Sequence, residues 1–586
     1  QSMKPFIVLC LLSILLSCKK DLSHPNVVFI LSDDQGWGDM SSHGNPVLQT
    51  PTLDRLATEG FEFNRFFASP LCAPTRASLL TGRYHMRTGV TSVSNGLEIM
   101  DEDETTLAEM FKASGYSTGI FGKWHNGAHY PHRPEDQGFD EFIGFCAGHL
   151  TNYFNTTLEH STNRPDEHPT EIKSVGYITD FLADQAIDFI KRHKQQPFFC
   201  YVPFNAPHSP FQVPDAYFDK YKSRGLDDTL ASIYGMVDNL DFNIGRLLQS
   251  LKDQRLDKNT IVIFMSDNGP NGVRYNGYMK GIKGQVDEGG VRVPSMVLWP
   301  GQIKAGTSTD QIAAHIDWYP TLQTLCHLNT LAGKPIDGKD LSGIILNKTD
   351  TLSDRKIFSH VAFLEKELKP KPGSVRTPRY RMVWKSAAAE LYDMSSDPQQ
   401  LVNLAATDSI TLSTLSNLYQ SWFSSATQDY QPIKPVNVNT SYIELPAYES
   451  TFTGSLHYAE GHGWAHDWLQ HWATTEDEIS WSIISDTPTT FTAYLKYTCP
   501  AGDTGSIITT YINEAPVASA KIIVPFDPPL TPSPDRVIRK EAYEKEWRMM
   551  ELGKIVVPSG QSKLSLRASE VRHGMVGEVM GVVMER

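Results

Sequence analysis

The sequence lacks an excess of basic residues. Its 586 residues include 53 lysines and arginines against 67 aspartates and glutamates, which gives a formal net charge of −14. A nucleic-acid-binding protein needs a basic face, so the bulk charge gives no support to a nucleic-acid partner. Hydrophobic residues make up 40% of the chain and charged residues 20%, a composition that argues against a disordered protein and indicates globular domains.

Beyond the N-terminus the sequence also lacks an apolar run long enough to be a transmembrane helix. At the N-terminus, a lysine precedes a short apolar run over residues 6–16, which has the form of a signal-peptide core. The run ends in Leu-Leu-Ser-Cys at residues 15–18, which resembles the lipobox of bacterial lipoproteins and implies lipidation of Cys18. A plain secretory signal is the alternative. We therefore expect residues 1–22 to direct export to the periplasm, the outer membrane or the cell surface, with a lipid anchor as the only membrane contact.

Cysteine is scarce, with seven residues in the whole chain. Cys10 and Cys18 belong to the targeting segment, and five scattered cysteines follow it: Cys72, Cys146, Cys200, Cys326 and Cys499. An odd, scattered set in a long chain is no disulfide framework, and at least one thiol must stay unpaired.

Internal repeats and low-complexity tracts are absent, and the length implies more than one domain. Apolar strands alternate with amphipathic helices over roughly residues 23–345. The predicted strands cover residues 26–31, 117–121, 197–203, 260–265 and 293–299, and the predicted helices cover residues 52–59, 105–114, 178–193 and 231–251. This alternation predicts an α/β domain with a mixed, mostly parallel sheet between helices.

The pattern changes after residue 345. Residues 346–435 predict a small α+β subdomain. From residue 436 to 586, short β-rich runs such as 479–484, 490–497 and 506–512 predict a separate β-sandwich. The proline-rich stretch 525–534 is expected to be a long loop within that sandwich.

Oxygen-bearing side chains follow two of the predicted strands. Asp33 and Asp34 come directly after the first strand, and Asp267 and Asn268 come after the strand at 260–265. Ligands of open α/β sheets collect beyond the carboxyl ends of the strands. Carboxylate and amide oxygens suit a hard cation such as Ca²⁺ or Mg²⁺. Turn formation and helix capping are the alternative explanation for these residues.

Basic side chains follow other predicted strands or lie on nearby loops. The set consists of Arg76, Lys123, His125, His208 and Lys283. Taken singly, each is more often a solvated or packed residue, but together, beside a divalent cation, they match what a dianionic oxyanion and its leaving group require.

Cys72 stands in the sequence Cys-Ala-Pro-Thr-Arg, residues 72–76. Pro74 is expected to be the first residue of a helix, which would place Cys72 just before the helix N-terminus and Arg76 one turn further on. The residues alone predict a thiolate of low pKa, and hence a cysteine-nucleophile enzyme as a competing hypothesis.

Residues 72–76 resemble the Cys-x-Pro-x-Arg signature of type I sulfatases, in which the fourth residue is usually serine but is also found as the threonine present here. Further motifs follow the order of that family: residues 32–39, 81–83, 121–125, 205–208, 266–269, 281–283, 288–294 and 391–393. The resemblance covers roughly residues 25–410, and it implies an alkaline-phosphatase-like fold for the α/β domain.

The resemblance also implies a mechanism. A maturation enzyme would convert Cys72 to formylglycine (3-oxoalanine), and the hydrated aldehyde would attack sulfur. Residue 72 would hold Ca²⁺ (Mg²⁺ is the alternative) together with Asp33, Asp34, Asp267 and Asn268. The implied catalytic roles are to steady the diol (Arg76), neutralise the sulfate oxygens (Lys123 and Lys283), orient or deprotonate the diol (His125) and protonate the leaving alcohol (His208).

The substrate is less constrained by the sequence. An exported enzyme with a trailing β-sandwich favours a sulfated polysaccharide or its oligosaccharides. Plausible rim residues, each more simply explained as ordinary surface, are His129, His132, Arg133, Asn152, Tyr153, Arg274 and Tyr275. The sandwich tryptophans fit glycan binding or core packing equally well: Trp464, Trp468, Trp472 and Trp481. The alternatives are a phosphonate or phosphate ester hydrolase of the same superfamily and an inactive glycan-binding lipoprotein.

Overall fold

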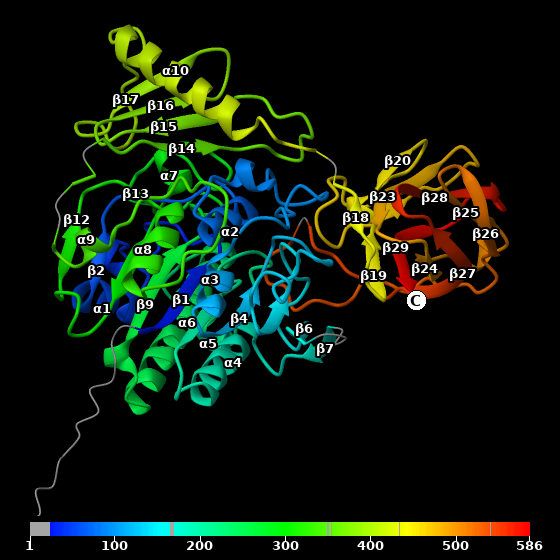
Figure 1. Ribbon diagram of the computed structural model, residues 1–586, viewed down its shortest axis with the longest axis horizontal. Helices are drawn as coiled ribbons and strands as arrows, with labels where there is room; N and C mark the ends of the chain where they lie inside the picture. The colour runs from blue at the N-terminus through cyan, green and yellow to red at the C-terminus, as the bar shows by residue number, and fades with distance from the viewer. Residues whose placement is uncertain (1–23, 165–168, 349–350, 353, 433, 540) are drawn as a thin grey trace, which may run out of the picture.

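The computed structural model describes residues 24–586 except 165–168, 349–350, 353, 433 and 540 (Figure 1). The predicted targeting segment, with Cys18, lies outside the described residues, so its lipidation stays a prediction. Among the helices of the described part, none combines the length and the apolar character needed to cross a bilayer.

A ten-stranded mixed sheet forms the centre of the α/β part (Figure 1). Its middle strands are parallel and fully buried, as expected for near-continuous apolar runs covered on both faces. In spatial order the strands are β12 (Thr307–Thr309), β2 (Phe61–Phe63), β11 (Ser295–Leu298), β9 (Thr260–Ser266), β1 (Asn26–Ser32), β8 (Phe198–Pro203), β4 (Ser117–Lys123), β5 (Glu141–Phe145), β6 (Thr157–Thr162) and β7 (Thr170–Lys173). The predicted mixed, mostly parallel sheet is confirmed.

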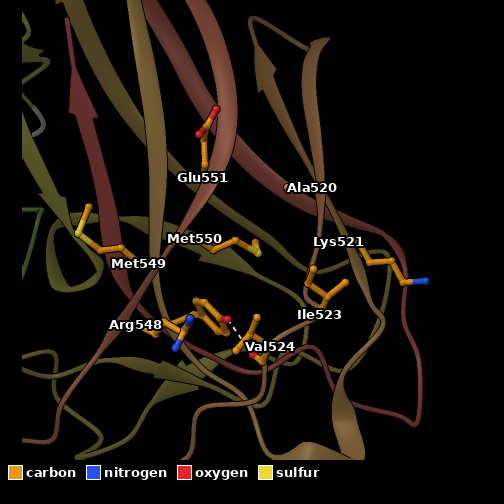
Figure 2. Close-up of a pocket in the computed structure, with 9 residues that line it drawn as sticks. Ala520, Lys521, Ile523, Val524, Arg548, Met549, Met550 and Glu551 are labelled. Atoms are coloured by element: carbon orange, nitrogen blue, oxygen red, sulfur yellow. Dashed lines mark hydrogen bonds between the residues drawn. The ribbon is translucent and has the colours of Figure 1, made fainter.

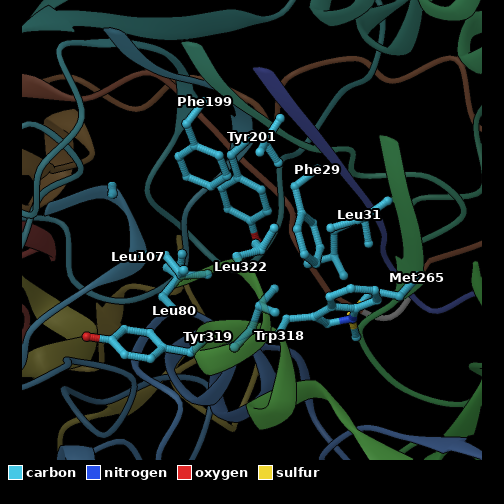
Figure 3. Close-up of a cluster of buried hydrophobic side chains, with 14 of the residues drawn as sticks. Phe29, Leu31, Leu80, Leu107, Phe199, Tyr201, Met265, Trp318, Tyr319 and Leu322 are labelled. Carbon is cyan, nitrogen blue, oxygen red and sulfur yellow. The ribbon is translucent and has the colours of Figure 1, made fainter. Parts of the chain in front are cut away.

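Helices cover both faces of this sheet and enclose two apolar cores. One face carries α2 (Cys72–Thr81), α3 (Leu107–Ala113) and α8 (Trp318–Leu325), and the other carries α1 (Pro51–Glu59), α4 (Ile178–Arg192) and α6 (Asp228–Asp253). Figure 3 shows the first core, in which Phe29 lies between Tyr201 and Trp318 with ring centroids 6.0 Å from each. These rigid layers fix the carboxyl ends of β1, β8, β9 and β4 relative to one another.

Two further units follow along the chain (Figure 1). An antiparallel sheet packs against α10 (Ser409–Ala426), and its strands are β14 (Ile357–His360), β15 (Gly373–Arg376), β16 (Tyr380–Trp384) and β17 (Ala389–Asp393). Beyond it, two six-stranded sheets enclose a separate core. Their main strands are β23 (Glu478–Ser485), β24 (Thr489–Thr498), β25 (Ile507–Ile512), β27 (Arg548–Val557), β28 (Gly560–Glu570) and β29 (Glu578–Glu585). The additional C-terminal antiparallel sheets are therefore confirmed, while the exact domain boundaries stay predictions.

The sandwich tryptophans serve mainly in packing. Trp472 and Trp481 are part of the sandwich core, Trp468 is buried, and Trp464 is half-buried. A hollow of about 470 Å³ lies on the sandwich between β27 and residues 520–524, and its lining residues are drawn in Figure 2. Its one lining aromatic residue, Tyr497, is buried and donates to the Val524 carbonyl at 2.8 Å, so the hollow offers no exposed ring on which a sugar would stack.

The proline-rich stretch 525–534 is not confined to the sandwich, which corrects the prediction. It belongs to an extended excursion between β26 (Ala515–Lys521) and β27 that reaches the α/β part, where Ser533 accepts a hydrogen bond from Gln212 at 2.9 Å. Figure 1 shows this orange-red segment beside the α/β unit. Proline supplies no ladder donor, and this stretch accordingly forms isolated bridges, Phe526 with Cys499 and Leu530 with Lys545, and no regular strand.

Candidate active site

The predicted oxygen ligands meet at the carboxyl edge of the central sheet. Because β1 and β9 are parallel neighbours in register from Asn26–Thr260 to Ser32–Ser266, the residues that follow them emerge side by side. The Asp34 amide donates to Asp267 Oδ1 at 3.1 Å, and Asn268 Nδ2 donates to Asp34 Oδ1 at 2.8 Å. Both aspartates after β1, together with Asp267 and Asn268, are fully buried.

Cys72 is the first residue of α2, so the helix begins two residues earlier than the position of Pro74 predicted. The helix begins at Cys72 with Leu71 as N-cap, so Pro74 is its third residue and not its first. The prediction was wrong because any residue of the first turn can lack an N–H donor without losing an intrahelical hydrogen bond. Arg76 lies one turn on, as expected.

The predicted low-pKa thiolate is also wrong. Burial raises the pKa of the Cys72 thiol, and this effect outweighs the lowering by Lys123 and Lys283. An unmodified Cys72 would therefore be protonated and a poor nucleophile at neutral pH. The raised pKa of Cys72 argues against the cysteine-nucleophile hypothesis.

The basic residues surround the same point. Arg76 Nη2 lies 2.9 Å from Asp267 Oδ2, and Lys123 Nζ lies 2.7 Å from Asp33 Oδ2. On the other side, Asp34 is 2.7 Å from Lys283 Nζ and 3.7 Å from His208 Nε2. The structure thus brings together the predicted catalytic and metal-binding residues, and His125, two residues after Lys123, lies within reach of the charges of Lys123, Arg76 and Asp33.

His125 is placed by a left-handed backbone conformation, with φ of 64°. Its Nε2 contacts the Val93 carbonyl at 2.9 Å, and its buried Nδ1 has no partner. Burial and the neighbouring Lys123 lower the pKa of His125 well below its ordinary value, so the ring is neutral. A Cβ at Gly148 would lie 2.6 Å from His125 Nε2, so only glycine allows this close approach.

The side chains at this edge fit a hard cation. Ligand atoms of Asp33, Cys72 and Asp267 lie within 4.8 Å of one another. Asp33 Oδ1 and Asn268 Oδ1 are buried without a partner. Burial, Asp33 and Asp34 raise the pKa of Asp267 to about 7, whereas Lys123 and Lys283 hold the pKa values of Asp33 and Asp34 below their ordinary range despite burial. An oxygen-rich, strongly acidic set of this kind suits Ca²⁺ or Mg²⁺.

Most of the predicted rim residues form hydrogen bonds or ion pairs within the protein. Arg274 lies 2.7 Å from Asp39 and so braces the loop after β1, while Tyr275 donates to the His43 carbonyl at 3.0 Å. The others bond within the loops or to the sandwich: His129 to Glu449, Trp124 to the His132 carbonyl, Arg133 to Glu135, Asn152 to Gln212 and Tyr153 to the Ser209 carbonyl.

Sequence reasoning missed His149. Its ring is parallel to that of His208 with centroids 6.2 Å apart, and only 8% of the residue is exposed. His149 follows β5 by four residues at the same sheet edge as Lys123. The rule that located the other site residues, polar groups just beyond strand ends, would have indicated it.

Glu98, in the α/β part, lies near Glu449 of the sandwich, so its ionisation affects the stability of the interface between the two units. Burial and the nearby Glu449 raise the pKa of Glu98 to about 8. A folded-state pKa above the unfolded value means that the folded state binds more protons, so Glu98 contributes a loss of stability as pH rises from about 4.5 to about 8. We expect Glu98→Gln to raise the melting temperature by about 2 °C or more at pH 8 and much less at pH 5. Differential scanning calorimetry at both pH values checks this, and an equal shift at the two would contradict it.

The fold and this site define a hydrolase of the alkaline phosphatase superfamily. A family model described as Sulfatase matches residues 25–328, more than half of the chain, and one described as N-sulphoglucosamine sulphohydrolase, C-terminal, matches residues 283–421. The chain belongs to the sulfatase family and is a sulfuric ester hydrolase.

Individual relatives agree. The N-acetylgalactosamine-6-sulfatase of Canis lupus familiaris is 36% identical over 365 residues, covering 57% of this chain and 68% of its own length. The structure of Ps i-CgsB in complex with k-i-k-neocarrahexaose is 26% identical with a TM-score of 0.63, covering 70% of this chain and 94% of its own. The phosphonate monoester hydrolase of Agrobacterium radiobacter shares the fold, at 22% identity and a TM-score of 0.52 over 69% of this chain and 96% of its own.

Proposed function

We propose that this sulfatase hydrolyses sulfate esters of a polysaccharide or its oligosaccharides, with formylglycine made from Cys72 and a bound Ca²⁺. The observation that carries the proposal is the convergence of Cys72, three buried aspartates, Asn268 and four basic side chains at one sheet edge. Ion pairs with Arg76, Lys123 and Lys283 compensate part of this buried charge, and the unpartnered oxygens of Asp33 and Asn268 are left for a cation. The assignment of Ca²⁺ over Mg²⁺ rests on the family resemblance.

The cation would be held by Asp33, Asp34, Asp267, Asn268 and residue 72, and it would supply Lewis-acid stabilisation of the developing negative charge. Residue 72 as formylglycine would supply a hydrated aldehyde, whose hydroxyl is the nucleophile for sulfur. A separate maturation enzyme would be needed to make it.

The remaining roles follow from the positions of the protein's own side chains. Arg76 is oriented by Asp267 and by the Lys123 carbonyl, to which its Nη1 donates at 2.8 Å, so its guanidinium is fixed beside residue 72. Lys123 and Lys283 approach from two sides and would donate to sulfate oxygens, where a preformed cationic pocket stabilises the transition state. Neutral His125 can accept a proton from a residue-72 hydroxyl or orient it.

His208 is the candidate for the proton donor to the leaving alcohol. Its Nδ1 contacts the Ser209 carbonyl at 2.6 Å and so carries a hydrogen, which means that Nε2, 3.7 Å from Asp34, can donate only when the ring is doubly protonated. Burial and Lys283 lower the pKa of His208, whereas the Asp34 carboxylate raises it and favours this donor form. Lys283 flanks the same carboxylate and can share in stabilising the alkoxide as it leaves.

A carbohydrate substrate is supported by the relatives. One is described as an N-acetylgalactosamine-6-sulfatase and another was solved with a neocarrahexaose. The apolar run and the Leu-Leu-Ser-Cys sequence at residues 15–18 support export, and we propose a periplasmic or surface location, where such glycans are encountered.

A substrate panel tests the proposal. We expect the matured enzyme to release sulfate from at least one of N-acetylgalactosamine 6-sulfate, a neocarrahexaose and glucosamine 2-N,6-O-disulfate, and to act far more slowly on an aryl phosphonate monoester. Inorganic sulfate and phosphonate products are quantified by ion chromatography. Preference for the phosphonate would move the protein to the phosphonate hydrolase function, and tight glycan binding without sulfate release would indicate a binding protein.

A further inference from the structure

Two loops of the β-sandwich reach the active site. One runs over residues 459–468, between β21 (His457–Tyr458) and β22 (Leu469–Gln470), and the other is the excursion after β26. They are bonded to each other, because Glu460 accepts hydrogen bonds from the amides of Ala542 at 3.0 Å and Tyr543 at 2.7 Å. The two loops therefore act as one structural unit at the edge of the sandwich.

The excursion holds the loop that carries His208. Glu541 accepts a hydrogen bond from Ser209 Oγ at 3.3 Å, directly after His208. Asp535 accepts from Gln212 Nε2 at 2.7 Å, and Gln212 in turn accepts from the Tyr153 amide at 2.8 Å. Tyr153 completes the connection, because its hydroxyl donates to the Ser209 carbonyl at 2.8 Å.

The other loop holds His149. His466 Nε2 contacts the His149 carbonyl at 3.0 Å, and the two rings lie 5.7 Å apart. The Ala465 carbonyl also faces the His149 ring and, as a hydrogen-bond acceptor, raises the pKa of His149 against the larger effect of burial. His149 is thus enclosed between His208 on one side and the sandwich on the other.

One nitrogen of the His149 ring has no hydrogen-bond partner. Its Nε2 is buried without a partner, as are Asp33 Oδ1, Asn268 Oδ1 and His125 Nδ1 at the neighbouring site. Since Nε2 has no partner, the Ala465 carbonyl faces the other ring nitrogen, Nδ1, and a carbonyl requires a hydrogen there. Nε2 of the neutral ring is therefore an acceptor. Burial, followed by His466 and His208, lowers the pKa of His149 well below its ordinary value and keeps the ring neutral. A neutral acceptor complements an O–H group and not a sulfate oxygen.

We infer that the β-sandwich completes the substrate site by holding His149 beside His208, where His149 Nε2 accepts a hydrogen bond from a hydroxyl of the sulfated sugar. The inference rests on the proposed function, because the leaving alcohol at His208 is the sugar itself. It makes His149 a contact for the sugar, separate from the groups that surround the sulfate, and it makes His466 a positioning residue.

The test compares His149→Ala with the parent enzyme on two substrates. One is the sugar sulfate that the panel shows to be cleaved fastest, and the other is 4-nitrophenyl sulfate, which has no sugar hydroxyl. We expect KM for the sugar sulfate to rise about 5- to 10-fold, and kcat/KM to fall by at least about 5-fold more for the sugar sulfate than for the aryl ester. His466→Ala should change KM in the same direction by a smaller factor. His149→Gln, which keeps an acceptor, should recover part of the loss.

Binding gives a readout that does not depend on turnover. In a Cys72→Ala background, isothermal titration calorimetry with mono-deoxy analogues of the sugar sulfate should identify one hydroxyl whose removal weakens binding to the His149 protein but not to the His149→Ala protein. His457→Ala is the matched control, since His457 is an exposed histidine of the same sandwich that bonds only within it among the described residues. Equal loss on both esters, or no hydroxyl that couples to His149, would overturn the inference. Failure to release sulfate from any ester would instead overturn the proposed function.

Discussion

Replacement of Cys72 by alanine is expected to lower sulfate release by at least about 10³-fold, because the residue that supplies the nucleophile is lost while the surrounding charges remain. Cys72 is buried at the start of α2, close to Asp33 and Asp267. Alanine fits this space without strain, so the fold should be retained. Initial rates on the preferred sugar sulfate and the melting temperature measure the two effects separately.

The state of residue 72 decides between the two possible nucleophiles. A peptide mass spectrum of protein from a host with competent maturation machinery should show a loss of about 18 Da relative to the thiol, as expected for formylglycine. Iodoacetamide should then leave the activity unchanged. Cys499→Ala serves as the matched control, since Cys499 is a buried free thiol of the sandwich and its removal should leave kcat unaffected. An unmodified Cys72 in active protein, with inactivation by alkylation, would contradict the formylglycine mechanism.

Removal of the cation is expected to have an effect of similar size. Lewis-acid stabilisation contributes several kcal/mol to the transition state, so exhaustive chelation should reduce the rate about 10³-fold, with recovery on adding Ca²⁺. Binding should also stabilise the fold, by about 2.7 kcal/mol when free Ca²⁺ is a hundred times its Kd. The direction follows from Asp267, whose pKa is raised to about 7 by burial and by Asp33 and Asp34, because a bound cation would favour its ionised form.

A pair of variants locates the cation. Asn268→Ala removes the buried Oδ1 that has no partner, and it should raise the Kd for Ca²⁺ by about 10- to 100-fold. Asp103→Asn is the control, because Asp103 belongs to a second acidic group, with Asp101 and Glu104, but its side chain is 68% exposed and pairs with Lys334. Titration calorimetry and the Ca²⁺-dependent melting temperature measure both. The buried site would be refuted if Asp103→Asn raised the Kd for Ca²⁺ more than Asn268→Ala does, or if Ca²⁺ did not change the melting temperature.

Much of the site could be predicted because its residues directly follow apolar strands in the sequence. Asp33 and Asp267 each follow a buried apolar strand, and parallel strands place such residues at one edge. The α/β class and the C-terminal β-rich region followed from hydrophobic periodicity in the same way. The helix start at Cys72 was misplaced by two residues, because the first turn of a helix tolerates proline at several positions.

The sequence by itself determined the family, through motifs in order along residues 25–410, and the chemical character of the site, since its oxygen ligands and basic groups lie in short local patterns. Only the tertiary structure decided the direction in which the pKa of Cys72 shifts, because burial outweighs the lowering by Lys123 and Lys283. It alone decided that the proline-rich excursion and His466 reach the active site. His149 and His466 are 317 residues apart, and their contact depends on how two separately folded units pack, which no local pattern encodes.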